Sequence, residues 1–137
     1  MPIITLTTDF GHKDHFVAAL KGTILGALDE VDIVDISHGI SPFNIQECAY
    51  VLKNAYQHFP KGSIHIVGVD SEKSPENEHL VVVLDGHYFV SANNGVMSLI
   101  ASDSELEKVV EINLPNAETD SFPELKVFAQ VACHLAR

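Results

Sequence analysis

Three aspartates stand at the ends of predicted β-strands, where their side chains could reach a ligand. Asp9 follows a β-branched run, Asp35 lies within the end of a second strand, and Asp70 follows a third. In open α/β sheets, ligands bind beyond the carboxyl ends of the strands. A carboxylate there can grip a ribose diol, orient a water molecule or hold a cation, or it can simply cap its loop. Asp9 and Asp70 open loops and are the better candidates, whereas Asp35 precedes Ile36 and fits a structural hydrogen-bonding role.

Histidines and cysteines offer little further chemistry. His12 and His15 lie three residues apart beside Asp14, a spacing that allows a metal, but a loop histidine at a helix start is more often solvated or capping. We therefore predict no metal site. The sequence contains no GxSxG, GxGxxG or P-loop motif, which argues against a serine-hydrolase, Rossmann dinucleotide or NTPase site. Cys48 and Cys133 are far apart on predicted helix faces, as expected for buried free thiols in a reducing cytoplasm.

Composition limits the fold and the partners. The chain has 137 residues, 46% of them hydrophobic, which suits one globular domain with a real core. Its 19 acidic residues against 8 Lys and Arg give a formal net charge of −11, so we expect no nucleic-acid partner and no anionic membrane surface. No apolar run approaches the roughly 18–20 residues that span a bilayer. No secretory leader precedes the first strand, and we expect a cytoplasmic protein.

Strand and helix patterns alternate along the chain. Asp14 is the expected N-cap of the first helix, Asn44 with Glu47 reads as a capping box before the second, and Asp85-Gly86 predicts a two-residue hairpin turn. This order predicts an α/β fold, a mostly parallel sheet with helices on both faces in three layers. The predicted strands cover 1–8, 31–36, 63–69, 80–84, 87–90 and 108–112, and the predicted helices cover 14–28, 45–59, 96–101 and 124–137.

Several short motifs occur in a familiar order. They include TTDFG at 7–11, IVDISHGISPFNI at 33–45, FPKGSIH at 59–65 and VFAQVACHLA at 127–136. Together they resemble the S-adenosylmethionine (SAM) hydroxide adenosyltransferase family, which also contains SAM-dependent fluorinases and chlorinases. The resemblance covers nearly the whole chain, and the ordered set is far more specific than any one motif.

The resemblance implies an architecture and a reaction. The family has an N-terminal α/β domain followed by a smaller β-barrel domain, and this chain resembles the N-terminal domain alone, at 1–137, without the barrel. The resemblance implies that the full-length protein forms a homotrimer that holds the ligand between neighbouring subunits. Water or a halide attacks C5′ of the ribose of SAM and methionine leaves; with water the products are adenosine and methionine. SAM is then a substrate, and no cofactor is implied.

The resemblance also assigns roles to residues. Asp9 matches the aspartate that grips the ribose hydroxyls, and Phe43 falls where the family places an aromatic ring near the ligand. Asn94, in a matched Asn-Gly pair, is a further candidate for substrate binding. Asp70 matches the aspartate that holds and deprotonates the attacking water in the hydrolases. Its negative charge favours water over an anionic halide.

This sequence departs from the family pattern at three places, one of which is ANNG at 92–95, where the family usually reads Pro-Asp-Asn-Gly. After Asp70, where the family reads Pro-Gly-Val-Gly and then a basic pair, this chain reads SEKS at 71–74. The arginine that completes the water site is missing, and Lys73 or His79 could substitute for it. Pro123 occupies the position of the catalytic histidine and cannot transfer a proton.

These observations leave three hypotheses for function. The first is a divergent SAM hydrolase-like adenosyltransferase. The alternative is a non-catalytic module that binds SAM or adenosine, which the missing arginine and histidine favour. A SAM-dependent halogenase is third, because the Asp70 carboxylate would repel a halide.

Overall fold

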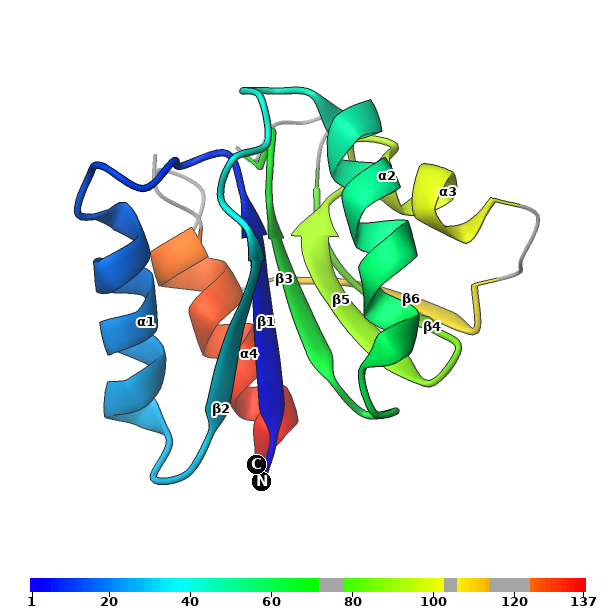
Figure 1. Cartoon of the computed structure of the whole chain (residues 1–137). Coiled ribbons are helices and arrows are strands. Elements are labelled where there is room, and N and C mark those ends of the chain that lie inside the picture. The colour runs from blue at the N-terminus through cyan, green and yellow to red at the C-terminus, as the bar shows by residue number, and fades with distance from the viewer. Residues whose placement is uncertain (72–77, 103–105, 114–123) are drawn as a thin grey trace.

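The computed structural model describes residues 1–71, 78–102, 106–113 and 124–137 (Figure 1). The strands are β1 (Ile3–Thr8), β2 (Asp32–Ser37), β3 (Ile64–Gly68), β4 (His79–Leu84), β5 (His87–Ala92) and β6 (Lys108–Glu111). The helices are α1 (Phe16–Ala27), α2 (Ile45–Ala55), α3 (Val96–Ala101) and α4 (Ala129–Ala136). A 3₁₀ turn, η1 (Tyr56–His58), follows α2, and a π-helical turn, η2 (Glu124–Phe128), precedes α4.

The strands form one sheet in the order β2-β1-β3-β5-β4-β6. Neighbours from β2 to β5 pair in parallel, while β4 runs antiparallel to both β5 and β6. The α/β class is confirmed, but the sheet is mixed. The cause is the predicted hairpin: a two-residue turn can join only antiparallel neighbours. Asp85 and Gly86 both have positive φ, 52° and 77°, as a type I′ turn requires.

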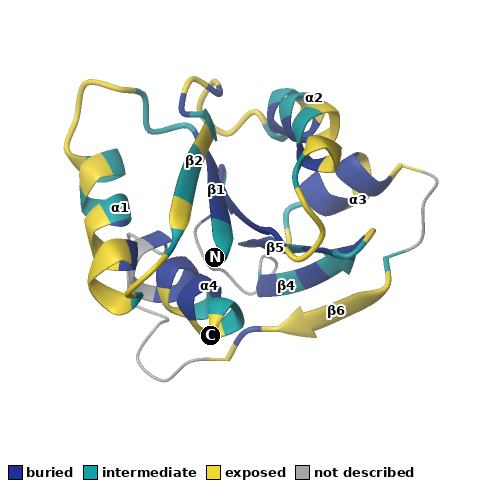
Figure 2. Cartoon of the chain, turned by 60° about the horizontal axis from the view of Figure 1, so that its bottom comes forward, coloured by how far each residue is buried: buried dark blue, intermediate teal, exposed yellow. Residues whose placement is uncertain are grey.

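Helices pack against both faces of the sheet. Helices α1 and α4 share one apolar cluster with β1 side chains such as Ile4 and Leu6 (Figure 1). Helices α2 and α3 share the other, which includes Val67 of β3 and Phe89 of β5. Because both faces are covered, the central strands β1 and β3 are buried along almost their whole length, and this includes polar residues such as Thr5 and His65. Strand β6, in contrast, is exposed at the edge of the sheet (Figure 2).

The helix starts differ in detail from the sequence expectation. Helix α1 begins at Phe16 with His15 as its N-cap, so the prediction of Asp14 was wrong: His15 already has helical backbone angles, φ −82° and ψ −5°. The capping box is half formed. Asn44 Oδ1 accepts a hydrogen bond from the Glu47 N–H at 3.0 Å, but the Glu47 carboxylate turns away to the N–H and hydroxyl of Ser41.

Two further expectations concern the cysteines and the membrane. Cys48 and Cys133 are free and buried, as predicted, and burial raises the pKa of the Cys48 thiol to about 12. Such a thiol stays protonated and unreactive. Within the described ranges, every helix is too short or too polar to cross a bilayer.

Candidate functional site

Asp9 and Asp70 emerge from neighbouring parallel strands. Thr8, the last residue of β1, is in register with Gly68, the last residue of β3. The Asp9 N–H donates to the Gly68 carbonyl at 3.4 Å. Burial raises the pKa of Asp9, a hydrogen bond from the Phe43 N–H opposes this, and the negative charge of Asp70 raises it further. The topology therefore brings together the two carboxylates that sequence reasoning selected.

Phe43 lies against Asp9 on the loop between β2 and α2. Its backbone N–H donates to Asp9 Oδ2 at 3.3 Å, and the residue as a whole is 72% exposed. Its φ of +62° is uncommon for a residue other than glycine, and such strain tends to gather at functional sites. An exposed aromatic face beside a carboxylate offers a surface on which a flat ring can stack while its polar substituents are bound.

Asn94 holds the backbone at Asp70. Its side-chain amide donates to the carbonyls of Val69 at 3.0 Å and of Asp70 at 2.8 Å. Its Oδ1 accepts from the Val96 N–H at 3.1 Å, at the start of α3. These bonds give Asn94 a structural task beside Asp70; its role in substrate binding stays a prediction.

His79 and Glu124 both contact Ser71, the residue after Asp70. His79 Nε2 donates to the Ser71 carbonyl at 2.7 Å, and its ring packs edge-on against Phe128. The Ser71 hydroxyl donates to Glu124 Oε2. All three side chains are buried. His79 was predicted as a substitute for the missing arginine, and the structure places it behind Ser71 in the protein interior.

Two candidate positions from the sequence analysis, and one residue that it missed, need separate mention. Lys73 and Pro123 lie outside the described residues. Glu124 was not predicted as a site residue. The only signal for it in the sequence is its place shortly before Val127 and Phe128, which are both buried. Such a pattern is equally typical of an ordinary helix start.

Asp35 takes part in a hydrogen-bond chain beneath the Asp9 loop. His38 Nε2 bonds to Asp35 Oδ1 at 2.8 Å, and its Nδ1 bonds to the Thr8 hydroxyl at 2.6 Å. Lys21 Nζ donates to Asp35 Oδ2 at 2.7 Å. Burial raises the pKa of Asp35, but the bonds from Lys21 and His38 outweigh it and lower the pKa overall. Asp35 is thus hydrogen-bonded as the structural interpretation predicts.

The series of hydrogen bonds from Asp35 through His38 to Thr8 has the acid–imidazole–hydroxyl order of a catalytic triad. Thr8, however, is completely buried. Its hydroxyl accepts from the Phe10 N–H at 3.2 Å, and the His38 carbonyl accepts from the Gly11 N–H at 2.7 Å. These hydrogen bonds therefore fix the loop that carries Asp9. His12 and His15 are exposed, and no group of three or more metal-ligating side chains occurs within the described ranges.

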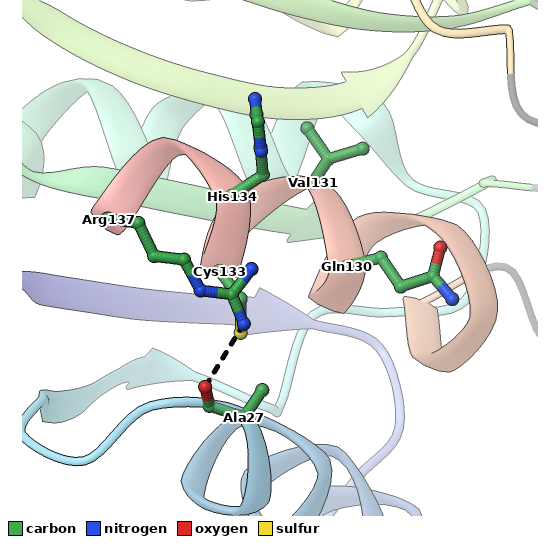
Figure 3. A pocket seen from close by; sticks show the side chains of 6 residues that line it. All are labelled: Ala27, Gln130, Val131, Cys133, His134 and Arg137. Carbon is green, nitrogen blue, oxygen red and sulfur yellow. Dashed lines mark hydrogen bonds between the residues drawn. The ribbon is translucent and has the colours of Figure 1, made fainter.

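Two cavities lie away from the two aspartates. One of about 470 Å³ lies between α1 and α4, where Arg137 Nη2 donates to the Ala27 carbonyl at 3.1 Å (Figure 3). A second, of about 420 Å³, lies between α3, β4 and β6 and includes Asn93 and Gly95, neighbours of Asn94. Neither is lined by Asp9, Asp70 or Phe43.

Comparison with known proteins identifies the family. The model of the SAM hydroxide adenosyltransferase N-terminal domain matches residues 4–137. The chain belongs to the SAM hydroxide adenosyltransferase family. An (R)-S-adenosyl-L-methionine hydrolase of Methanocaldococcus jannaschii is 38% identical over 118 residues, covering 82% of this chain and 44% of that protein. The enzyme of the same name from Salinispora arenicola is 26% identical over 98% of this chain and 53% of its own length.

Two further proteins are similar to this chain. A fluorinase of Actinopolyspora mzabensis is 33% identical over 63 residues, covering 46% of this chain and 21% of that protein. A solved structure from Thermotoga maritima, an uncharacterized conserved protein, superposes with a TM-score of 0.86 at 31% identity. The superposed region covers 98% of this chain and 53% of the Thermotoga maritima chain. The chain thus spans about half the length of the hydrolase relatives.

Proposed function

We propose that this chain belongs to a SAM hydrolase, in which water attacks C5′ of the ribose and displaces methionine. The observation that carries the proposal is the pair Asp9 and Asp70 at the carboxyl ends of two adjacent strands, beside the exposed ring of Phe43. In this proposal Asp9 binds the ribose hydroxyls, Phe43 packs near the ligand, and Asp70 holds the water. Relatives that are named SAM hydrolases support the assignment.

The proposed step is a simple substitution. A water oxygen forms a bond to C5′, the bond from C5′ to sulfur breaks, and its electron pair stays on the sulfur of methionine. The water releases one proton, which Asp70 accepts and passes to solvent. A sulfonium is a good leaving group, so the protein mainly aligns the water and strips solvent. SAM is the substrate, and the step needs no cofactor.

Charge favours a sulfonium substrate and a neutral nucleophile. The chain carries a formal net charge of −11, and the two aspartates add a local negative field that attracts a cation. The same field repels fluoride or chloride. We therefore propose hydrolysis over halogenation, although fluorinases are among the relatives.

The full-length gene product provides the test. Incubation with SAM and separation of the products by chromatography should yield adenosine and methionine in equal amounts. Addition of chloride or fluoride should leave the rate unchanged and give no halogenated nucleoside. The absence of adenosine, at protein concentrations where a SAM hydrolase turns over, would reject hydrolysis.

A non-catalytic module that binds SAM or adenosine is the second candidate. His79 is buried behind Ser71, and no described residue forms a salt bridge with Asp70. Pro123 has no proton to transfer at the position of the family's histidine. Calorimetry that detects binding of adenosine and SAM, together with no turnover, would favour this candidate.

We also propose a cytoplasmic homotrimer in which a neighbouring subunit completes the site. The exposure of Phe43 supports this, because an open aromatic residue beside Asp9 leaves one side of a ligand uncovered. Analytical ultracentrifugation of the full-length gene product tests it. A monomer that still binds adenosine with full affinity would contradict a shared site.

A further inference from the structure

Asp70 has a backbone conformation that needs support. Its φ of +50° lies in the left-handed region. That region is unfavourable for L-residues other than glycine, less so for aspartate and asparagine, and it persists where the surroundings enforce it. Asp85, the comparable aspartate in the hairpin turn, sits in a turn type that selects positive φ. Asp70 lies beyond the end of β3, so its conformation must be held by contacts.

Hydrogen bonds from three separate elements supply those contacts. Asn94, from the turn after β5, donates to the carbonyls of Val69 and Asp70. His79, at the start of β4, donates to the Ser71 carbonyl at 2.7 Å. Glu124, the first residue of η2, accepts from the Ser71 hydroxyl. The residues on both sides of Asp70 are therefore fixed, and Ser71 is held at its backbone and at its side chain.

Of these residues, Glu124 is the one whose burial is energetically least favourable. It is 3% exposed, and a carboxylate in the protein interior is unfavourable unless hydrogen bonds compensate for its lost hydration. The chain also leaves room for it: a Cβ on Gly68 would lie 3.0 Å from Glu124 Cγ and Oε2. A buried acid seated against a glycine of β3, two residues before Asp70, is better explained by a task at Asp70 than by packing alone.

We infer that Glu124 and His79 are positioning residues that act through Ser71 to hold Asp70 in its strained conformation beside Asp9. Together with Asn94 they form what we call the Asp70 clamp. The clamp fixes the carboxylate that is proposed to hold the water. Its catalytic consequence rests on the proposed hydrolysis, whereas its effect on the Asp70 backbone does not.

Paired variants of the full-length protein test the clamp. Glu124→Met removes the acceptor at nearly constant volume, while Glu124→Gln keeps an oxygen that can accept from Ser71. We expect Glu124→Met and Ser71→Ala each to lower kcat for adenosine formation by about 10- to 100-fold, because small misplacements of a reacting group are that costly. The kcat of Glu124→Gln should stay within about threefold of the wild-type value. The variant that combines Glu124→Met with Ser71→Ala should lose no more kcat than Glu124→Met alone.

Two further measurements separate positioning from a general loss of structure. The affinity for adenosine should change by less than about threefold in each variant, because Asp9 rather than Asp70 is proposed to hold the ribose. Tyr56→Phe is the matched control: it deletes a hydrogen bond of 2.8 Å to Asp85 at the opposite end of the sheet. It should leave kcat unchanged even if it lowers the melting temperature as much as Ser71→Ala.

Crystal structures of the variants make the inference independent of turnover. The φ of Asp70 should remain positive in Glu124→Gln and leave the left-handed region in Glu124→Met and Ser71→Ala. A positive φ in all three variants would overturn the clamp, as would a Glu124→Gln variant as slow as Glu124→Met. If the wild type forms no adenosine, the proposed function fails, and the φ of Asp70 alone decides on the clamp.

Discussion

The backbone N–H of Phe43 donates a hydrogen bond to the side chain of Asp9, with 3.3 Å between N and Oδ2. This bond joins two loops that are 34 residues apart in sequence. It also links a strained, exposed aromatic residue to a half-buried carboxylate. The orientation of the Asp9 side chain and the conformation of Phe43 therefore depend on each other. A ligand that binds one of them contacts a preorganised partner.

Replacing Asp9 should weaken ligand binding more than it changes stability. Asp9→Ala removes both the carboxylate and the partner of the Phe43 N–H, and we expect the dissociation constant for adenosine to rise by about tenfold or more, since hydrogen bonds to a charged group contribute about 1.5–3 kcal/mol. Isothermal titration calorimetry provides the measurement. Asp85→Asn, at the opposite end of the sheet, serves as the control and should bind as the wild type does. Unchanged affinity in Asp9→Ala would contradict ribose binding by Asp9.

Replacing Asp70 should affect turnover rather than binding. Asn tolerates a left-handed φ, so Asp70→Asn should keep the fold while it loses the base that takes the proton of water. We expect kcat to fall by about 10²- to 10⁴-fold, the usual contribution of acid–base catalysis. Asp70→Gly should be equally slow, yet melt at the same or a higher temperature because the backbone strain is relieved. A fully active Asp70→Asn would show that another group activates the water.

The sequence predicted the elements and the pair of aspartates because both depend on local patterns. Strand and helix periods give the order of elements, and parallel strands necessarily place Asp9 and Asp70 at the same edge of the sheet. The Asp85-Gly86 turn was equally clear, since only an antiparallel hairpin accommodates it. What the local patterns did not reveal was the strand order, in which β4 lies between β5 and β6 and pairs antiparallel with both.

The contacts that support the site could not be predicted in the same way. Ser71 and Glu124 are 53 residues apart, and no periodicity or motif connects them. A buried glutamate is also rare enough that sequence reasoning assigns it to the surface. The predicted N-cap of α1 was wrong for a local reason. Asp14 is the better capping residue by type, but the chain becomes helical only at His15.

Two histidines in the protein interior should make the protein sensitive to acid. His65 Nδ1 bonds to the Thr5 hydroxyl at 2.6 Å, and its Nε2 bonds to His87 Nδ1 at 3.1 Å. Burial, and then the neighbouring charge of His87, lowers the pKa of His65 to about 3. Burial likewise lowers the pKa of His87. When both rings are protonated, His65 Nε2 and His87 Nδ1 both carry a hydrogen, and the bond between them is lost because two donors face each other.

The sign of the pH effect follows from linkage. Both folded-state pKa values lie below the ordinary histidine value of 6.5, so the unfolded chain binds protons that the folded chain does not. The free energy of unfolding should fall as the pH drops from about 6.5 towards 3, by about 1.4 kcal/mol per pH unit for each proton taken up. Urea unfolding at several pH values measures this slope. A double variant, His65→Phe with His87→Phe, should be less steep in this window, and an equal slope would contradict the assignment.

Gly68→Ala should damage the site without touching any residue that binds the ligand. The new Cβ would lie 3.0 Å from Glu124 Cγ and Oε2 and 3.1 Å from Thr8 Cγ2, closer than these atoms normally approach. Overpacking of this kind costs about 1–3 kcal/mol, and it pushes Glu124 away from Ser71. We therefore expect a lower melting temperature and a loss of kcat similar to that of Glu124→Met.

A control and a second-site variant identify the cause of the Gly68→Ala effect. A Cβ on Gly22, in α1, meets nothing within 4 Å, so Gly22→Ala should leave kcat unchanged and raise stability by about 0.5–1 kcal/mol. Shortening the opposing side chain, in Gly68→Ala with Glu124→Ala, should restore part of the melting temperature because the clash disappears. It should not restore kcat, because the acceptor for Ser71 is gone. If the double variant recovers both properties, the acid at position 124 is dispensable and the steric contact with Gly68 alone explains the loss.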